Sequence, residues 1–544
     1  MHIFRMSFLM YDTSAKADAE IKTKTEVRNK MKKRLLAMVL AAVLVLSLAA
    51  CNANPKDGGK VANTDPLTRD DVIQIVIGSH PSWPYREDWK VWEYIEEGCG
   101  ATVEVTAFPS SEAGTKVNLM FAAPDTLPDL LYGSWKPGSD KHILSGAMIA
   151  LDDMKEYMPN YNAWLESLSE EEYSKLIVPR KGYDGKIYYT PVEGREKSQN
   201  VRAWLYRKDV FDKHNLETPT NYDELYEVCK KLKELYPEAY PMCVRSGTKV
   251  FETSGASWKP YWEPCFYYDF NSEEWSYGMG EDLMLEVLTF YKKLMDEKLI
   301  NPDFMTISNS GWQELVTTDR GFIMPEYQTR IDFFNGLARV GNPEFDLHAM
   351  VPPIAKEGGV AMVNKFNEDS MGLQIPNTRV ENRIANAAKF VDWLYTDEAR
   401  ELVSWGKEGE TYEVVDGKKQ FITDETKAQA NTLYGFGTYG TFTRMDPDAV
   451  FAFESDDIAE ARDMVLEHTM PYMNPYWWMS YNEEEYDIKE EYETAINTYA
   501  SEMVSKFLLG QEPLSKFDEY QKTLNEMGLP KLLSIYVSAY DRVK

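Results

Sequence analysis

Aromatic side chains gather in several short segments of this chain that read as neither helix nor strand. Three such segments are Pro81 to Tyr85 (PSWPY), Gly133 to Lys136 (GSWK) and Trp258 to Glu263 (WKPYWE). Phe, Trp and Tyr make up 13% of the chain, with 14 Trp, which is more than a core needs. Flat rings beside a few fixed hydrogen-bonding groups suit a ligand with apolar faces and a rim of hydroxyls, as a sugar has.

Strands and helices alternate around the first two of these segments. The patterns predict strands over 72–77, 101–106 and 129–132, with helices over 89–97 and 112–122 between them. Such alternation is typical of βαβ units and a mainly parallel sheet. Open α/β sheets bind ligands beyond the carboxyl ends of their strands, where Trp83 and Trp135 lie, so we predict that both stack on ligand.

The rest of the chain is richer in helix. We predict a strand from Asn200 to Tyr206 and a helix from Thr220 to Tyr236, with Thr220 as its N-terminal cap and Asp223 completing the capping arrangement. Further helices are expected over Leu283–Leu299 and Glu381–Glu401. The stretch from Asp457 to Lys506 is expected to be almost wholly helical.

The N-terminal region has the layout of an export signal. Residues 32–51, KKRLLAMVLAAVLVLSLAAC, combine a basic start, an apolar run and small residues that end on a cysteine. The apolar run is too short to span a bilayer, which takes about 20 residues. Leu48 to Cys51 resembles the bacterial lipobox, so Cys51 is the expected lipidation site, and Met31 is the expected start. Residues 1–50 are then signal and 51–66 a lipidated tether, which predicts attachment to the outer face of the cell membrane.

Charge and composition narrow the partners. Lys and Arg number 59 against 88 Asp and Glu, a net charge of −29, which argues against nucleic acid because binding it requires neutralised phosphates. The four cysteines after Cys51 and the six histidines show no ligand spacing, so we expect no cofactor and no metal. Free buried thiols are favoured over a disulfide, for which Cys229 and Cys243 are one possible pair.

Several motifs, in their order along the chain, resemble the extracellular solute-binding proteins of sugar-type ABC importers, in particular a subgroup of large oligosaccharide-binding lipoproteins of Gram-positive bacteria. The resemblance spans essentially the whole mature chain. The residues that carry it are LPDLLY (127–132), DGKIYYTP (184–191), LYRKDVF (205–211) with TPT (218–220), FVDWLYTDEA (390–399) and WGKEGETY (405–412).

The resemblance implies an α/β fold of two lobes joined by a hinge, with the ligand in a cleft between them. The first lobe is expected to comprise 67–195 and 370–405, and the second 200–365 and 440–544. The expected partners are an oligosaccharide, the permease subunits of an ABC importer and the membrane through the lipid, and a monomer is expected. The ligand-binding residues that we predict from these arguments are Trp83, Trp135, Trp258, Tyr261, Trp262, Glu263, Tyr327, Trp477 and Trp478.

Two alternatives stay open at this point. An exported glycoside hydrolase would use two carboxylates at a fixed separation, but the sequence offers no clear pair, so we expect no enzyme activity. The same fold could instead bind a peptide or a polyamine, because fold does not determine ligand and aromatic rings also attract ammonium groups.

The two first-lobe tryptophans give a direct prediction. Trp83→Ala or Trp135→Ala is expected to lower ligand affinity, measured by titration calorimetry, without unfolding the protein. Unchanged affinity in both variants would remove these residues from the site.

Overall fold

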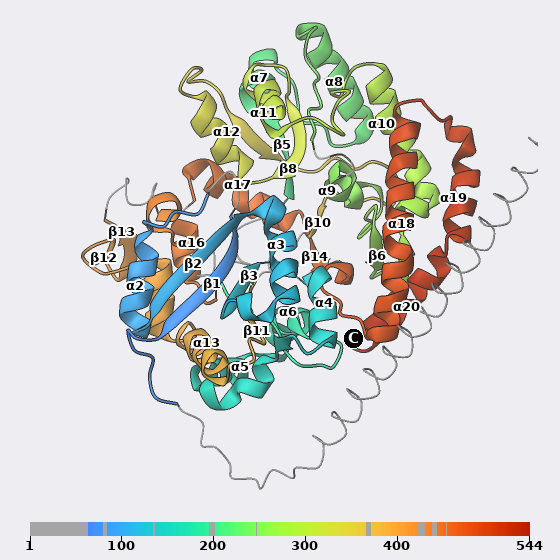
Figure 1. The fold of residues 1–544 in the computed structure, drawn as a ribbon. Coiled ribbons are helices and arrows are strands. Elements are labelled where there is room, and N and C mark those ends of the chain that lie inside the picture. The colour runs from blue at the N-terminus through green and yellow to red at the C-terminus, as the bar shows by residue number, and fades with distance from the viewer. Residues whose placement is uncertain are drawn as a thin grey trace, which may run out of the picture. The chain divides into compact units, whose positions relative to one another are not determined.

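The computed structural model describes residues 64–79, 84–133, 136–194, 202–245, 247, 249–365, 372–422, 430–437, 443–452 and 454–544. Within them the chain forms two α/β lobes, each built on its own sheet and core (Figure 1). This confirms the predicted fold class.

The sheet of the first lobe has five strands in the order β2-β1-β3-β11-β4. Strands β1 (Val72–Ser79), β2 (Thr102–Pro109) and β3 (Leu130–Gly133) are parallel to one another, which confirms the three predicted strands and their direction. Strand β11 (Gly372–Pro376) is antiparallel to both β3 and β4 (Met148–Ile149). The chain therefore returns to the first sheet long after leaving it.

Alternation explains how β1 is held in this sheet. Ile73, Ile75 and Ile77 share one face and are each at most 1% exposed, while Val76 packs in a separate cluster on the opposite face. Helices α2 (Lys90–Cys99) and α3 (Ser110–Ala122) connect the parallel strands. Both faces of the sheet are thus covered, as parallel strands require.

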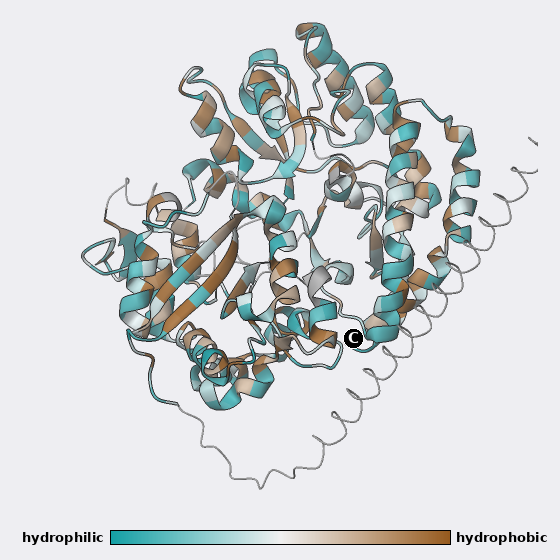
Figure 2. Cartoon of the chain, viewed as in Figure 1, coloured by the Kyte–Doolittle hydropathy of each residue, from teal (hydrophilic) through white to brown (hydrophobic). Residues whose placement is uncertain are grey.

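The second lobe has a different, antiparallel sheet in the order β8-β5-β9. Strand β5 (Arg202–Arg207) lies between β8 (Ile323–Tyr327) and β9 (Leu347–Met350). Trp204 points into one core, and its neighbours Ala203 and Leu205 point into another on the opposite face. In Figure 2 these strands carry stretches coloured as hydrophobic.

Helix α8 (Tyr222–Leu235) has its N-terminal cap one residue later than predicted, at Asn221 rather than Thr220. The Asn221 side chain accepts a hydrogen bond of 2.9 Å from the backbone N–H of Glu224. Thr220 instead donates, through its N–H and its hydroxyl, to the Glu224 carboxylate. The expected pair of Thr220 and Asp223 was therefore wrong by one position.

This cap gives a stability prediction. Asn221→Ala removes the acceptor of an otherwise unpaired N–H and is expected to lower the free energy of unfolding by about 1 kcal/mol. Asn221→Ser keeps a capping oxygen and serves as the control. Urea unfolding of the two variants side by side is the measurement, and equal midpoints would contradict the assignment.

Two other predicted helices are interrupted. The expected helix over 381–401 is two helices, α13 (Glu381–Trp393) and α14 (Asp397–Ser404), and the Thr396 side chain caps the second. The expected helical stretch over 457–506 contains α17 (Asp456–Glu467), strand β14 (Thr469–Met473) and α18 (Glu483–Leu508). Strand β14 forms because it pairs in parallel with β10 (Val363–Lys365), a partner that local sequence does not reveal.

The remaining elements complete the two lobes. Helices α19 (Phe517–Glu526) and α20 (Leu529–Asp541) pack with α18 in the core of the second lobe. The others are helices α4 (Lys136–Leu144), α5 (Pro159–Ser167), α6 (Glu170–Leu176), α7 (Lys208–His214), α9 (Lys249–Trp258), α10 (Asp282–Asp296), α11 (Asn309–Thr317), α12 (Arg330–Ala338) and α16 (Pro447–Ala452), and strands β6 (Phe266–Asp269), β7 (Glu274–Tyr277), β12 (Tyr412–Val415) and β13 (Lys418–Phe421).

Side-chain packing indicates where the chain passes from the first lobe to the second for the last time. Met445 and Val450 lie in the core of the first lobe, so packing favours a crossing after Ala452 rather than near Gly440. Elsewhere the Ser480 hydroxyl, just before α18, donates to the buried Asp140 carboxylate of α4. Ser480 and Asp140 thus join segments that pack with different lobes.

Cys99, Cys229, Cys243 and Cys265 are free thiols, and the first three are buried. Among the described residues, we find no helix with the length and apolarity needed to cross a bilayer.

Candidate functional site

The predicted first-lobe residues fall outside the part of the chain that the structure describes. This holds for Trp83, for Trp135 and for the lipidation residue Cys51. The strands that precede the two tryptophans, β1 and β3, are parallel neighbours and end at Ser79 and Gly133. These two strand ends lie at the same edge of the sheet, and ligand contact by the two tryptophans stays a prediction.

The predicted segment from Trp258 to Glu263 lies in the second lobe and joins α9 to β6. Trp262 is completely buried, and Trp258 at the end of α9 is 6% exposed; both rings belong to the core of the second lobe. We therefore correct the expectation for these two residues, because a ring enclosed by protein cannot stack on a ligand in this conformation. Tyr261, between them, is half-buried and has a positive φ of 64°.

Close backbone approach fixes this segment in place. A Cβ atom at Gly255 would lie 2.1 Å from the Trp262 carbonyl oxygen, and one at Gly278 would lie 1.9 Å from the Glu263 carbonyl oxygen. Neither distance is possible for a side-chain carbon, so both positions require glycine. The irregular chain from Trp258 to Glu263 is thus held between α9 and the turn after β7.

Glu263 forms the centre of a buried hydrogen-bond network. Its Oε2 atom accepts from the Asn474 amide at 3.0 Å and from the Trp477 indole N–H at 3.2 Å. Asn474 also donates to the Phe266 carbonyl at 2.9 Å. Burial raises the pKa of the Glu263 carboxyl to about 7, although these donors favour the charged form. The predicted residue Trp477 is therefore hydrogen-bonded to Glu263 and is half-buried.

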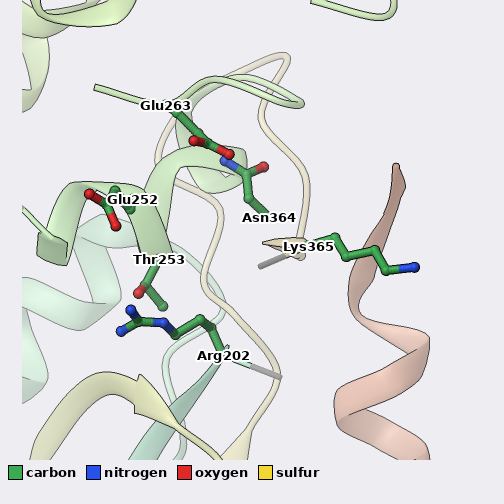
Figure 3. Close-up of a pocket in the computed structure, with 6 residues that line it drawn as sticks. All are labelled: Arg202, Glu252, Thr253, Glu263, Asn364 and Lys365. Carbon is green, nitrogen blue, oxygen red and sulfur yellow. The ribbon is translucent and has the colours of Figure 1, made fainter. Parts of the chain in front are cut away.

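A small pocket lies beside this network (Figure 3). It is lined by Arg202, Glu252, Thr253, Glu263, Asn364 and Lys365. The Asn364 amide donates to the Trp262 carbonyl at 2.6 Å, and its side chain lies next to Glu263, whereas Lys365 points away from the other five. The space holds about one water molecule, so it admits a hydroxyl but no sugar ring in this conformation.

Two atoms of this pocket have unused hydrogen-bonding capacity. The Thr253 hydroxyl and the Asn364 carboxamide oxygen are buried and meet no partner among the described residues. Buried polar atoms are normally satisfied by protein, water or ligand. The pocket can therefore recognise a hydroxyl group placed over it.

Three aromatic rings, Tyr261, Phe270 and Tyr472, pack against one another, and Tyr261 and Tyr472 belong to segments that adjoin pocket residues; the three are called the aromatic trio here. Phe270 and Tyr472 lie 5.0 Å apart between ring centres at 26°, and Tyr261 lies 4.9 Å from Phe270 and 6.3 Å from Tyr472. Tyr472 is 57% exposed, which is unusual for so large an apolar ring. It belongs to β14, whose next residue, Met473, pairs with the pocket residue Lys365.

The last two predicted residues differ in their surroundings. Tyr327 is the final residue of β8 and is half-buried, with the Arg202 guanidinium 3.8 Å above its ring and donating to its hydroxyl at 3.1 Å. Trp478 packs on the core of the second lobe, 6.2 Å from Tyr540 of α20. The packing favours a structural role for Trp478 and leaves Tyr327 beside the pocket residue Arg202.

Stacked rings, a polar pocket and a fixed carboxylate together suit a hydroxyl-rich ligand. Within the described ranges no group of His, Cys, Asp and Glu is arranged to hold a metal ion. Residues 88–401 match the model of the bacterial extracellular solute-binding protein family. The chain belongs to this family.

Alignments with relatives cover most of the length of this solute-binding protein. It is 22% identical to Lipoprotein LipO of Bacillus subtilis over 78% of this chain and 82% of LipO. It is 23% identical to the fructooligosaccharide ABC transporter substrate-binding protein FusA of Streptococcus pneumoniae over 93% of this chain and 97% of FusA. Among solved structures, the alginate-binding protein AlgQ2 superposes with a TM-score of 0.71 at 22% identity, covering 88% of this chain and 100% of that one.

The resemblance seen in the sequence is thus confirmed, and so is the two-lobed fold. Sequence reasoning missed Phe270, Tyr472, Thr253 and Asn364 of this solute-binding protein. The exposed Tyr472 lies in a stretch, TMPYM, that reads as the end of a helix until β10 is known to pair with it.

Proposed function

We propose that this solute-binding protein captures an oligosaccharide between its lobes and delivers it to the permease of an ABC importer. The observation that carries the proposal is the aromatic trio beside a pocket with unused hydroxyl-binding capacity. Rings supply the flat apolar surface, and the pocket supplies the polar groups, that a sugar requires. The names of FusA and AlgQ2, which refer to carbohydrate binding, support the same reading.

We further propose that the protein is held at the extracellular face of the membrane by a lipid on Cys51. The signal-like run before Cys51 and the name of the relative LipO support this. Labelling cells with a radioactive or alkyne-bearing fatty acid tests it. Loss of the label in Cys51→Ser is the expected result, and a label that persists would contradict it.

A ligand that prefers the native state raises its melting temperature, so a thermal-shift screen tests the proposed binding. The panel contains neutral and acidic oligosaccharides, spermidine and mixed peptides. A shift with one glycan class is expected. A higher melting temperature with spermidine or peptides, and an unchanged one with all glycans, would instead favour the alternative ligands.

A second candidate function, glycoside hydrolysis, rests on Glu252 and Glu263, which line one pocket. Hydrolases use two carboxylates, one with a raised pKa, but they need room for a sugar ring between them. The pocket is too small, and Oε2 of Glu263 already accepts hydrogen bonds from Asn474 and Trp477. We therefore propose binding without turnover, which release of reducing ends from the identified glycan would contradict.

A further inference from the structure

Three arginines meet at one edge of the β8-β5-β9 sheet and are called the arginine cluster here. Arg202 is the first residue of β5 and lies opposite Tyr327, the last residue of β8. Arg330 is the first residue of α12, three positions further along the chain. Arg245 follows Met242, which bridges to the start of β8 in parallel, so its segment runs toward the same edge.

One carboxylate, Glu326, lies among these arginines. Its Oε2 atom is 2.7 Å from Nε of Arg245, and its Oε1 atom is 3.7 Å from Nη1 of Arg202. Oε1 also accepts the backbone N–H of Tyr327 at 2.9 Å. Both oxygens of Glu326, which is 4% exposed, are thus engaged by groups other than Arg330.

Arg330 is buried with an unsatisfied donor. It is 7% exposed, and its buried Nε–H meets no hydrogen-bond acceptor among the described residues. Its guanidinium lies 5.9 Å from the Trp312 ring. Burial lowers the pKa of Arg330, and Arg245 and Arg202 act in the same direction, while Glu326 opposes them. A buried charge is costly unless it is paired, and arginine stays charged in proteins.

The cluster adjoins the proposed binding site, because Arg202 lines the pocket as well. Guanidinium groups bind carboxylates through two parallel hydrogen bonds, with higher geometric specificity than lysine achieves. The net charge of the chain is −29, but charges beyond about 8 Å are largely screened at physiological salt. Distant acidic groups therefore do not cancel the positive potential at the arginine cluster.

We propose that the arginine cluster binds a carboxylate of the captured oligosaccharide, so that the substrate class is uronate-bearing glycans rather than neutral ones. The inference rests on the proposed function and names the substrate class of the same site. Arg330 supplies a guanidinium whose Nε–H meets no acceptor among the described residues, and Arg245 lies against the same Trp312 ring, 4.6 Å from its centre.

The test compares glycans that differ only in charge. Titration calorimetry is run with trigalacturonate, triguluronate and trimannuronate, each beside its methyl ester, and with galacturonate monomer and sulfate as small anions. The native protein is expected to bind at least one free trimer 30-fold or more tightly than its ester. Arg330→Met is expected to reduce that preference to threefold or less, and Arg330→Lys to retain part of it.

Arg320→Met is the matched control, because Arg320 lies before the opposite end of β8, where its guanidinium pairs with the exposed Glu314. It should leave the preference unchanged. Folding of each variant is checked by circular dichroism. If Arg330→Met does not fold, the test rests on the preference of Arg330→Lys and on the comparison of free trimer with ester in the native protein.

The outcomes separate this inference from the proposed function. Binding of neutral glycans without any preference for free uronates overturns the inference and leaves oligosaccharide capture standing. An undiminished preference in Arg330→Met also overturns it, as does equal binding of sulfate or the monomer, which would indicate a site for an isolated anion. The absence of a binding signal with every glycan overturns the proposed function and this inference together.

Discussion

Glu263→Gln is expected to be more stable than the native protein at pH 8 by roughly 3 kcal/mol. Burial raises the pKa of this carboxyl from 4.5 to about 7, and one unit corresponds to about 1.4 kcal/mol. Below pH 4.5 the group is protonated whether the chain is folded or not. Between 4.5 and 7 only the unfolded chain ionises, so native stability falls as pH rises, and above 7 the full cost remains.

The amide of the variant can still accept from Asn474 and Trp477 through its oxygen, so the network is kept while the titration is removed. Urea unfolding from pH 4.5 to 8 measures the difference. Glu104→Gln, an exposed carboxylate on β2, controls for the loss of one negative charge. Stability curves of the native protein and Glu263→Gln that run parallel over this range would show that Glu263 does not titrate as described.

Tyr472→Ala is expected to weaken binding of the glycan found in the thermal-shift screen by about 10- to 50-fold, since it removes the most exposed ring of the aromatic trio. Stability should change by no more than about 0.5 kcal/mol, because the ring is 57% exposed.

Tyr472→Phe keeps the stacking surface and removes only the hydroxyl, so it should bind within about threefold of the native protein. Calorimetry on the three proteins is the measurement. Native affinity in Tyr472→Ala would mean that the trio only packs against itself and that the sugar lies elsewhere.

Local patterns were enough to predict the three parallel strands of the first sheet, because the apolar alternation around Ile73, Ile75 and Ile77 and the Gly100 turn after α2 are encoded within a few residues. They failed where a distant partner decides the structure. The pattern of residues 469–473 is compatible with helix, and only the pairing of β14 with β10, about a hundred residues earlier, makes it a strand.

The site shows the same division. Aromatic density drew attention to the segment from Trp258 to Glu263, but density cannot tell an enclosed ring such as Trp262 from a half-buried one such as Tyr261. Tyr472 and Phe270 join Tyr261 only after three separate elements pack together. The charge imbalance at Arg330 likewise depends on which side chains surround it, and sequence spacing does not record that.

Strand β11 lies between β3 and β4 in the first sheet, although more than 200 residues separate it from either of them along the chain. Among the described residues β4 pairs with β11 alone, so this edge of the sheet is not completed until residue 376 is available. Contacts this distant in sequence slow folding and leave edges exposed meanwhile. During synthesis, the first lobe therefore stays incomplete until most of the second lobe has been made, and a fragment ending before β11 would lack the strand that joins β4 to the three parallel strands.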